Sequence, residues 1–136
     1  MFEVFTNTSQ TLTQNSAIAF DVTKFGDGRV SLGSSGKTIT IRTPGRYLIS
    51  FDAIGGSSTA ATPFTIQLYV NGTACPCALS TNTVATANDL EALGFSTLVQ
   101  VNQSCCCADN NQTFQLVATN AVSGTISHAN LAVIRL

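Results

Sequence analysis

Apolar and polar residues alternate through most of this chain, and that pattern limits the possible folds more than any other feature. The alternation is clear in the segments 38–42, 46–54, 64–70, 94–101, 113–119 and 126–136. Successive side chains of an extended strand point to opposite faces, so each segment is predicted to form a β-strand. Helical periodicity is nearly absent, because the one candidate, residues 85–95, is short and contains Gly94.

Turn signals separate these segments at regular intervals. They are FGDG (25–28), GSSG (33–36), PG (44–45), GGSSTAATP (55–63), NG (71–72), ND (88–89) and VSG (122–124). Short strands at such spacing predict an all-β sandwich or barrel of about eight to ten antiparallel strands. The 136 residues show no internal repeat and no shift in composition, so we expect one domain.

The chain carries little charge and has no long apolar segment. The first feature argues against a nucleic-acid partner and the second against insertion into a membrane. Charged residues make up 10% of the sequence, the formal net charge is −1, and the six Lys and Arg residues are scattered. Phosphate binding needs clustered basic residues, so no nucleic-acid partner is expected. No segment approaches the roughly 18 apolar residues that span a bilayer. The first residues lack the pattern of a secretory signal, so neither membrane insertion nor classical secretion is expected.

Two of the predicted strands, within 47–54 and 126–136, are apolar on both faces. A strand of a sandwich has one face on the core, so something else must cover the second face. Since no helices are predicted, another subunit is the simplest cover. The residues that we expect at this subunit interface are Tyr47, Leu48, Ile54, His128, Asn130, Ala132 and Ile134.

Four segments, in this order and spacing, resemble the TNF/C1q-like jelly-roll domain. They are AIAFDV (17–22), TPGRYLISFDAIG (43–55), FTIQLYVNGTACP (64–76) and ANLAVIRL (129–136). The most specific piece is Pro44-Gly45-x-Tyr47 at the start of a central strand. The resemblance is closer to the bacterial and phage versions, which cap collagen-like spore-surface proteins of Firmicutes or occur as small phage virion proteins. It covers residues 15–136 and implies a TNF/C1q-like jelly-roll β-sandwich that forms homotrimers.

The resemblance also implies a function. Spore-surface relatives carry Gly-X-Y repeats before the domain, whereas none is present here. We therefore expect a virion protein, a capsid decoration or head fibre, assembled in the host cytoplasm and displayed on the virion surface. Its expected partners are the major capsid protein or another virion protein, with a host-surface glycan as a further candidate. Residues 1–14 would be an attachment or edge-pairing segment, or a plain first strand. The alternative function is the trimeric head domain of a bacterial spore- or cell-surface filament.

The chain contains five cysteines, which are Cys75, Cys77, Cys105, Cys106 and Cys107. In an up-and-down antiparallel sandwich, alternate connections lie at the same end. This places both cysteine groups at one end, beside Pro44, and predicts that Cys75 or Cys77 lies near at least one of the other three. Disulfides between the two loops, or between subunits, are the preferred interpretation. Reduced thiols come next, and then a zinc site, although the C-x₂₋₄-C spacing is missing. A redox catalyst ranks last, because no C-x-x-C is present.

His128 is the only histidine, and in the last predicted strand we expect it to share a face with Ile126, Asn130, Ala132 and Ile134. We interpret it as a packed interface residue, with a three-fold metal or anion site as the alternative. The sequence contains no G-x-S-x-G, and its few acidic residues fall mostly in predicted turns. The protein is therefore expected not to be an enzyme, and no cofactor is expected.

Overall fold

The computed structural model describes residues 1–102, 112–120 and 122–136, and within these ranges the regular structure is all β. None of the described residues lies in a helix that could cross a membrane. The strands are β1 (Phe2–Thr6), β2 (Gln10–Leu12), β3 (Val22–Phe25), β4 (Val30–Leu32), β5 (Ile39–Ile41), β6 (Gly45–Ser57), β7 (Pro63–Val70), β8 (Thr73–Thr83), β9 (Glu91–Val101), β10 (Gln112–Ala118) and β11 (Gly124–Arg135).

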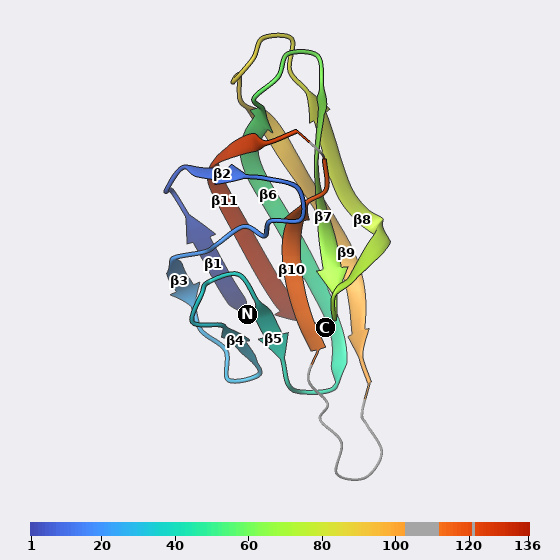
Figure 1. The fold of residues 1–136 in the computed structure, drawn as a ribbon. Coiled ribbons are helices and arrows are strands. Elements are labelled where there is room, and N and C mark those ends of the chain that lie inside the picture. Colours follow the sequence, from blue (N-terminus) through green and yellow to red (C-terminus); the bar gives the residue numbers. More distant parts are fainter. Residues whose placement is uncertain (103–111, 121) are drawn as a thin grey trace.

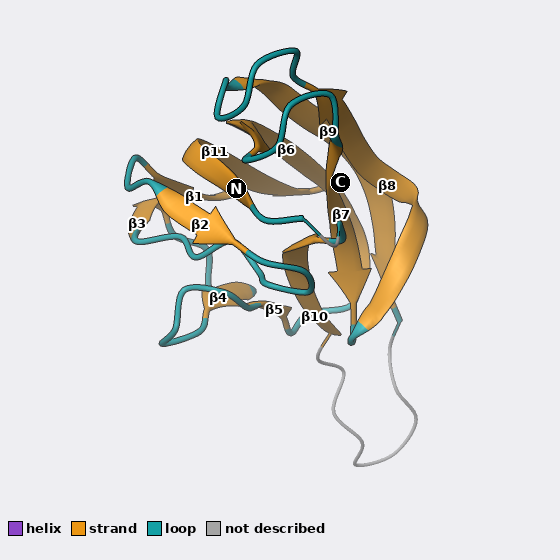
Figure 2. Cartoon of the chain, turned by 45° about the horizontal axis from the view of Figure 1, so that its top comes forward, coloured by secondary structure: helices purple, strands orange, loops and turns teal. Residues whose placement is uncertain are grey.

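These strands form two antiparallel sheets (Figure 1, Figure 2). The six-stranded sheet has the order β3-β1-β11-β6-β9, and β2 also pairs with β11. The five-stranded sheet has the order β4-β5-β10-β7-β8. The predicted fold class, an all-β antiparallel sandwich, is confirmed. The structure has more strands than predicted because short three-residue strands such as β2 and β4 are too brief to show alternation.

The core lies between the two sheets and follows from the alternation. On β6 the side chains of Tyr47, Ile49 and Phe51 are buried, and on β7 those of Phe64 and Ile66 are buried. Fully burying a large apolar side chain is worth about 1.5–3 kcal/mol. On β6 the odd-numbered residues from Tyr47 to Ala53 therefore face the core, and the even-numbered residues face outwards.

The first strand belongs to the sandwich. In Figure 1, β1 lies beside β11, and it pairs with β11 on one edge and β3 on the other. Its side chains Phe2 and Val4 are buried in the core. Residues 2–6 are therefore an internal strand of the six-stranded sheet. The proposed boundary at residue 14 stays a prediction.

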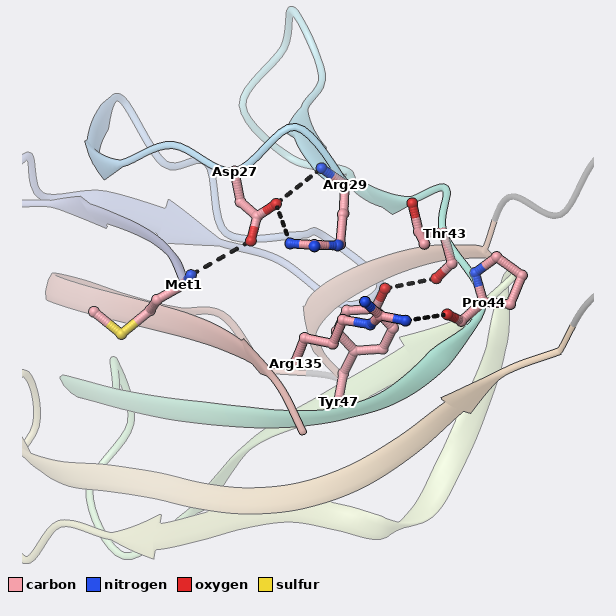
Figure 3. Close-up of polar contacts among 7 residues, drawn as sticks. All are labelled: Met1, Asp27, Arg29, Thr43, Pro44, Tyr47 and Arg135. Carbon is pink, nitrogen blue, oxygen red and sulfur yellow. Dashed lines mark hydrogen bonds and ion pairs between the residues drawn. The ribbon is translucent and has the colours of Figure 1, made fainter.

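The Pro-Gly-x-Tyr motif makes a tight entry into β6 (Figure 3). Gly45 has a φ of 152°, which L side chains rarely adopt. The guanidinium of Arg135, from β11, lies over this glycine and donates to the Pro44 carbonyl at 3.3 Å. The Tyr47 hydroxyl donates to the Thr43 carbonyl at 2.6 Å, and burial raises the pKa of Tyr47. Each residue of the motif thus has a structural role in this turn.

A second polar group in Figure 3 joins the connection before β4 to the start of β1. The carboxylate of Asp27 accepts a hydrogen bond from the backbone N–H of Arg29 at 3.0 Å, and the Arg29 guanidinium lies at 3.4 Å. The amino nitrogen of Met1 lies 3.4 Å from the other carboxylate oxygen. The Arg29 backbone amide lowers the pKa of Asp27 most, and the nearby positive charges lower it further.

Candidate functional site

The candidate site is the outer face of the six-stranded sheet, which points away from the core. Leu48 on β6 lies opposite Ile134 of β11 on one side and opposite Leu98 of β9 on the other. Directly opposed residues of an antiparallel pair share a face, so the three side chains form a continuous aliphatic row. Leu98 is 66% exposed, which is high for a leucine within a strand. We call these three residues the aliphatic row.

A second apolar feature lies six residue positions along the strands from the aliphatic row. There Ile54 of β6 stands between His128 of β11 and Ala92 of β9. These three residues, with Asp52, Ala53 and Leu93, line a hollow of about 260 Å³. Ile54 is 43% exposed, and the His128 Nδ1 forms a hydrogen bond with Asn7 Oδ1. We call Ile54, His128 and Ala92 the histidine row.

The band between the two rows is small and polar. It consists of two cross-strand sets, Ala132–Ser50–Ser96 and Asn130–Asp52–Gly94. β1 extends the face at its other edge, where Glu3 lies opposite Ala132 and Phe5 lies opposite Asn130. A second hollow of about 300 Å³, lined by Arg46, Leu98, Val99 and Gln100, lies beside the aliphatic row. The face thus combines exposed aliphatic side chains with two depressions.

Six of the seven residues predicted for the interface lie together on this face, and these are Leu48, Ile54, His128, Asn130, Ala132 and Ile134. Tyr47 does not, because alternation directs it into the core, where it is 1% exposed. That another subunit covers the face stays a prediction. The contribution of β9, above all Leu98, was missed, although its place between Thr97 and Val99 in an alternating segment was a usable signal.

The predicted face-sharing of His128 with Ile126 is wrong. The pairing of β11 with β6 shifts register between Ile126 and His128, which marks a β-bulge. A bulge adds one residue to one strand and so reverses the side chains beyond it. Ile126 is therefore buried, whereas His128 lies on the outer face.

Cys75 and Cys77 were predicted to lie in a loop, and this is wrong, because both lie within β8. Tyr69 pairs with Ala74 but Gln67 pairs with Leu79, so residues 75–78 form a wide bulge on the edge of the five-stranded sheet. The other three cysteines fall outside the described residues, so their predicted proximity stays a prediction. Among the described side chains, no group of three or more His, Cys, Asp and Glu residues could hold a metal ion.

The described strand ends that flank these connections lie at one end of the sandwich. The backbone N–H of Asn71, in the β7–β8 turn, donates to the Thr113 carbonyl at the start of β10. Val101, at the end of β9, pairs with Gly45. The turn at Asn71, the Pro44 turn and the two strand ends around 102–111 therefore share one end of the sandwich.

A scan against models of protein families matched none of them, and a search of curated protein sequences found no match. Among solved structures, the chain is similar to Eiger TNF from S. frugiperda, with a TM-score of 0.70 and 10% identity over 99% of this chain and 92% of that one. This chain has the TNF-like jelly-roll fold. The chain is also similar to the crystal structure of murine APRIL at pH 5.0, with a TM-score of 0.59 and 6% identity over 92% of this chain and 97% of that one.

Proposed function

We propose that this protein is a homotrimeric structural protein of a phage virion, acting as a capsid decoration or a head fibre. The observation that carries the trimer is the outer face of the six-stranded sheet. Leu98 and Ile54 are 66% and 43% exposed in the single chain, and they belong to separate apolar rows on one face. Burying the exposed part of each side chain against a second subunit would contribute about 1 kcal/mol.

Copies of the same chain are the best-supported cover for this face. In an assembly with closed rotational symmetry, every subunit buries its apolar surface against a neighbour. A three-fold ring is one such assembly. The sequence resemblance to the TNF/C1q-like family implies a trimer, and the TNF-like fold supports that assignment. The small polar band around Ser50 and Ala132 permits close approach of backbones in such an assembly.

The virion role is supported by the sequence resemblance to small phage proteins and by the composition. Charged residues are 10% of the chain, and the surface is instead rich in Thr, Ser, Asn and Gln. Such a surface suits attachment to a particle, with the major capsid protein or another virion protein as the partner. Loops at the ends of the sandwich would then be presented outwards, where a host-surface glycan is a candidate ligand.

Two measurements test the proposal separately. Light scattering during size-exclusion chromatography should give three times the 14.2 kDa mass of the chain. A monomer mass at micromolar concentration would refute the trimer. Electron microscopy of purified particles with a labelled antibody should then place the protein on virions. Label on spores or on cell-surface filaments would instead support the filament head domain.

A further inference from the structure

Cys75 and Cys77 are brought together by the bulge of β8. Their Sγ atoms lie 3.1 Å apart, with Pro76 between them in the chain. A disulfide has an S–S length of about 2.05 Å, so the two sulfurs need to approach each other by only about 1 Å for the pair to be bridged.

The two thiols have different surroundings. Cys77 is exposed, whereas Cys75 is half-buried and packs against the core. Thr97 lies on β9, an edge strand of the other sheet that contacts β8, and its hydroxyl favours the ionised form of Cys77. The hydrogen bond from Cys75, and then the Thr97 hydroxyl, lowers the pKa of Cys77, while the contact between the two thiols and burial raise the pKa of Cys75. Cys77 is therefore the thiol that solvent reaches and the one with the lowered pKa, whereas Cys75 is the less accessible of the two.

We propose that Cys75 and Cys77 form a thiol–disulfide exchange site, in which Cys77 is the attacking thiolate and Cys75 the resolving thiol. The co-reactant is a small external disulfide. The Cys77 thiolate attacks one of its sulfurs, forms a mixed disulfide and releases one thiolate. Cys75 then loses its proton to that thiolate and attacks the Cys77 sulfur, releasing the second thiolate. The protein loses two electrons and two protons, and the external disulfide becomes two thiols.

Closure of the pair would link residues 75 and 77 within the bulge at the edge of the five-stranded sheet. In a reducing cytoplasm the pair stays open, and outside the cell it closes. This timing rests on the proposed virion role, whereas the exchange chemistry depends only on the geometry of β8 and β9.

The test uses the full chain with Cys105, Cys106 and Cys107 all changed to Ser, so that only the pair remains. The reduced protein is treated with glutathione disulfide, and its thiols are titrated and its peptides mapped by mass spectrometry. We expect the loss of both thiols and a disulfide within the peptide that contains both residues. A mixed disulfide that persists on Cys77, or modification of Cys75 first, would overturn the proposal.

Single variants in this background separate the two roles. Cys75→Ser should stop at the glutathione adduct of Cys77, and Cys77→Ser should leave Cys75 unmodified. Thr97→Val should slow alkylation of Cys77 several-fold, and Thr97→Ser should restore the rate. The chain with all five cysteines should give the same Cys75–Cys77 peptide. Bonds from Cys75 or Cys77 to residues 105–107 in that chain would contradict the assignment.

Discussion

Leu48 on β6 and Leu98 on β9 stand directly opposite each other on the outer face of the six-stranded sheet. If this face is a subunit interface, a charge at Leu98 must be buried or must keep the subunits apart. We expect Leu98→Asp to weaken assembly by about 2 kcal/mol or more per chain, because burial of the leucine is lost. Sedimentation equilibrium should then show monomers at concentrations where the parent is a trimer.

Leu79→Asp is the matched control for this substitution. Leu79 is 43% exposed and pairs with Gln67, so it lies on the outer face of the opposite sheet. The Leu79→Asp substitution should leave the mass of the assembly unchanged. If both variants dissociate equally, the interface is wrongly placed.

Ala132 offers a second probe of the same face. It lies between Glu3 of β1 and Ser50 of β6 in the register of the sheet. A lysine at this position can pair with Glu3 within one chain, so the Ala132→Lys variant should still fold. Its charge on the outer face should oppose assembly and lower the mass measured by light scattering. An unchanged mass and melting temperature would show that this strand faces solvent in the assembly.

The Pro44-Gly45 turn gives a prediction about stability. A Cβ atom at Gly45 would lie 3.0 Å from the Arg135 Nε, and the φ of 152° is strained for any L side chain. We expect Gly45→Ala to reduce the free energy of unfolding by about 1–3 kcal/mol. Gly28→Ala is the control, because no atom lies within 4 Å of its added Cβ. Urea unfolding should leave Gly28→Ala close to the parent.

Tyr47 predicts a response to alkali. Burial raises its pKa above the ordinary value of about 10, so the neutral phenol is favoured in the folded state. Its contribution to stability is complete below pH 10 and is lost as the pH rises through the raised pKa. Tyr47→Phe should cost about 1 kcal/mol at neutral pH, because the hydrogen bond to Thr43 is lost. The variant should also lose less stability than the parent between pH 9 and pH 12.

Asp27 predicts the opposite response, to acid. Its lowered pKa means that the carboxylate contributes stability above its unfolded pKa of about 3.9, and that this is lost as the pH falls through the folded value. Asp27→Asn should flatten the dependence of unfolding free energy on pH below about 4. Arg29→Gln should keep most of that dependence, since the backbone amide of residue 29 remains. Equal flattening in both variants would assign the effect to the guanidinium.

The alternation of apolar residues was enough to predict the sandwich, and the Asn-Gly signal was enough to predict a turn at residues 71–72. Both residues of that turn have positive φ, 51° and 82°, as a two-residue hairpin requires. The same alternation separates Tyr47 from Leu48, so placing both at one interface contradicted the pattern itself. The resemblance to the TNF/C1q-like family agrees with the observed fold.

Irregularities within strands were not predictable by the same reasoning. The bulge after Ile126 reverses the faces of β11 without interrupting its run of apolar residues. Its only sign in the sequence is that the inward-facing residues Ile126 and Ala129 are three positions apart and not two. Cys75 and Cys77 were assigned to a loop, yet they lie in an edge strand, where a bulge accepts Pro76. Bulges depend on which strand lies alongside, and one segment of sequence does not contain that information.

The position of β11 affects how the protein can be made. β11 lies between β1 and β6, so the earliest strand to be synthesised has its longest pairing with the latest. Until residues 124–135 leave the ribosome, β6 lacks one of its two neighbouring strands. β1 likewise lacks the strand that joins it to the rest of its sheet. Folding dominated by such distant pairings is slow and leaves strand edges open to other chains. Nascent copies synthesised close together would therefore be at most risk of aggregation just before the final strand emerges.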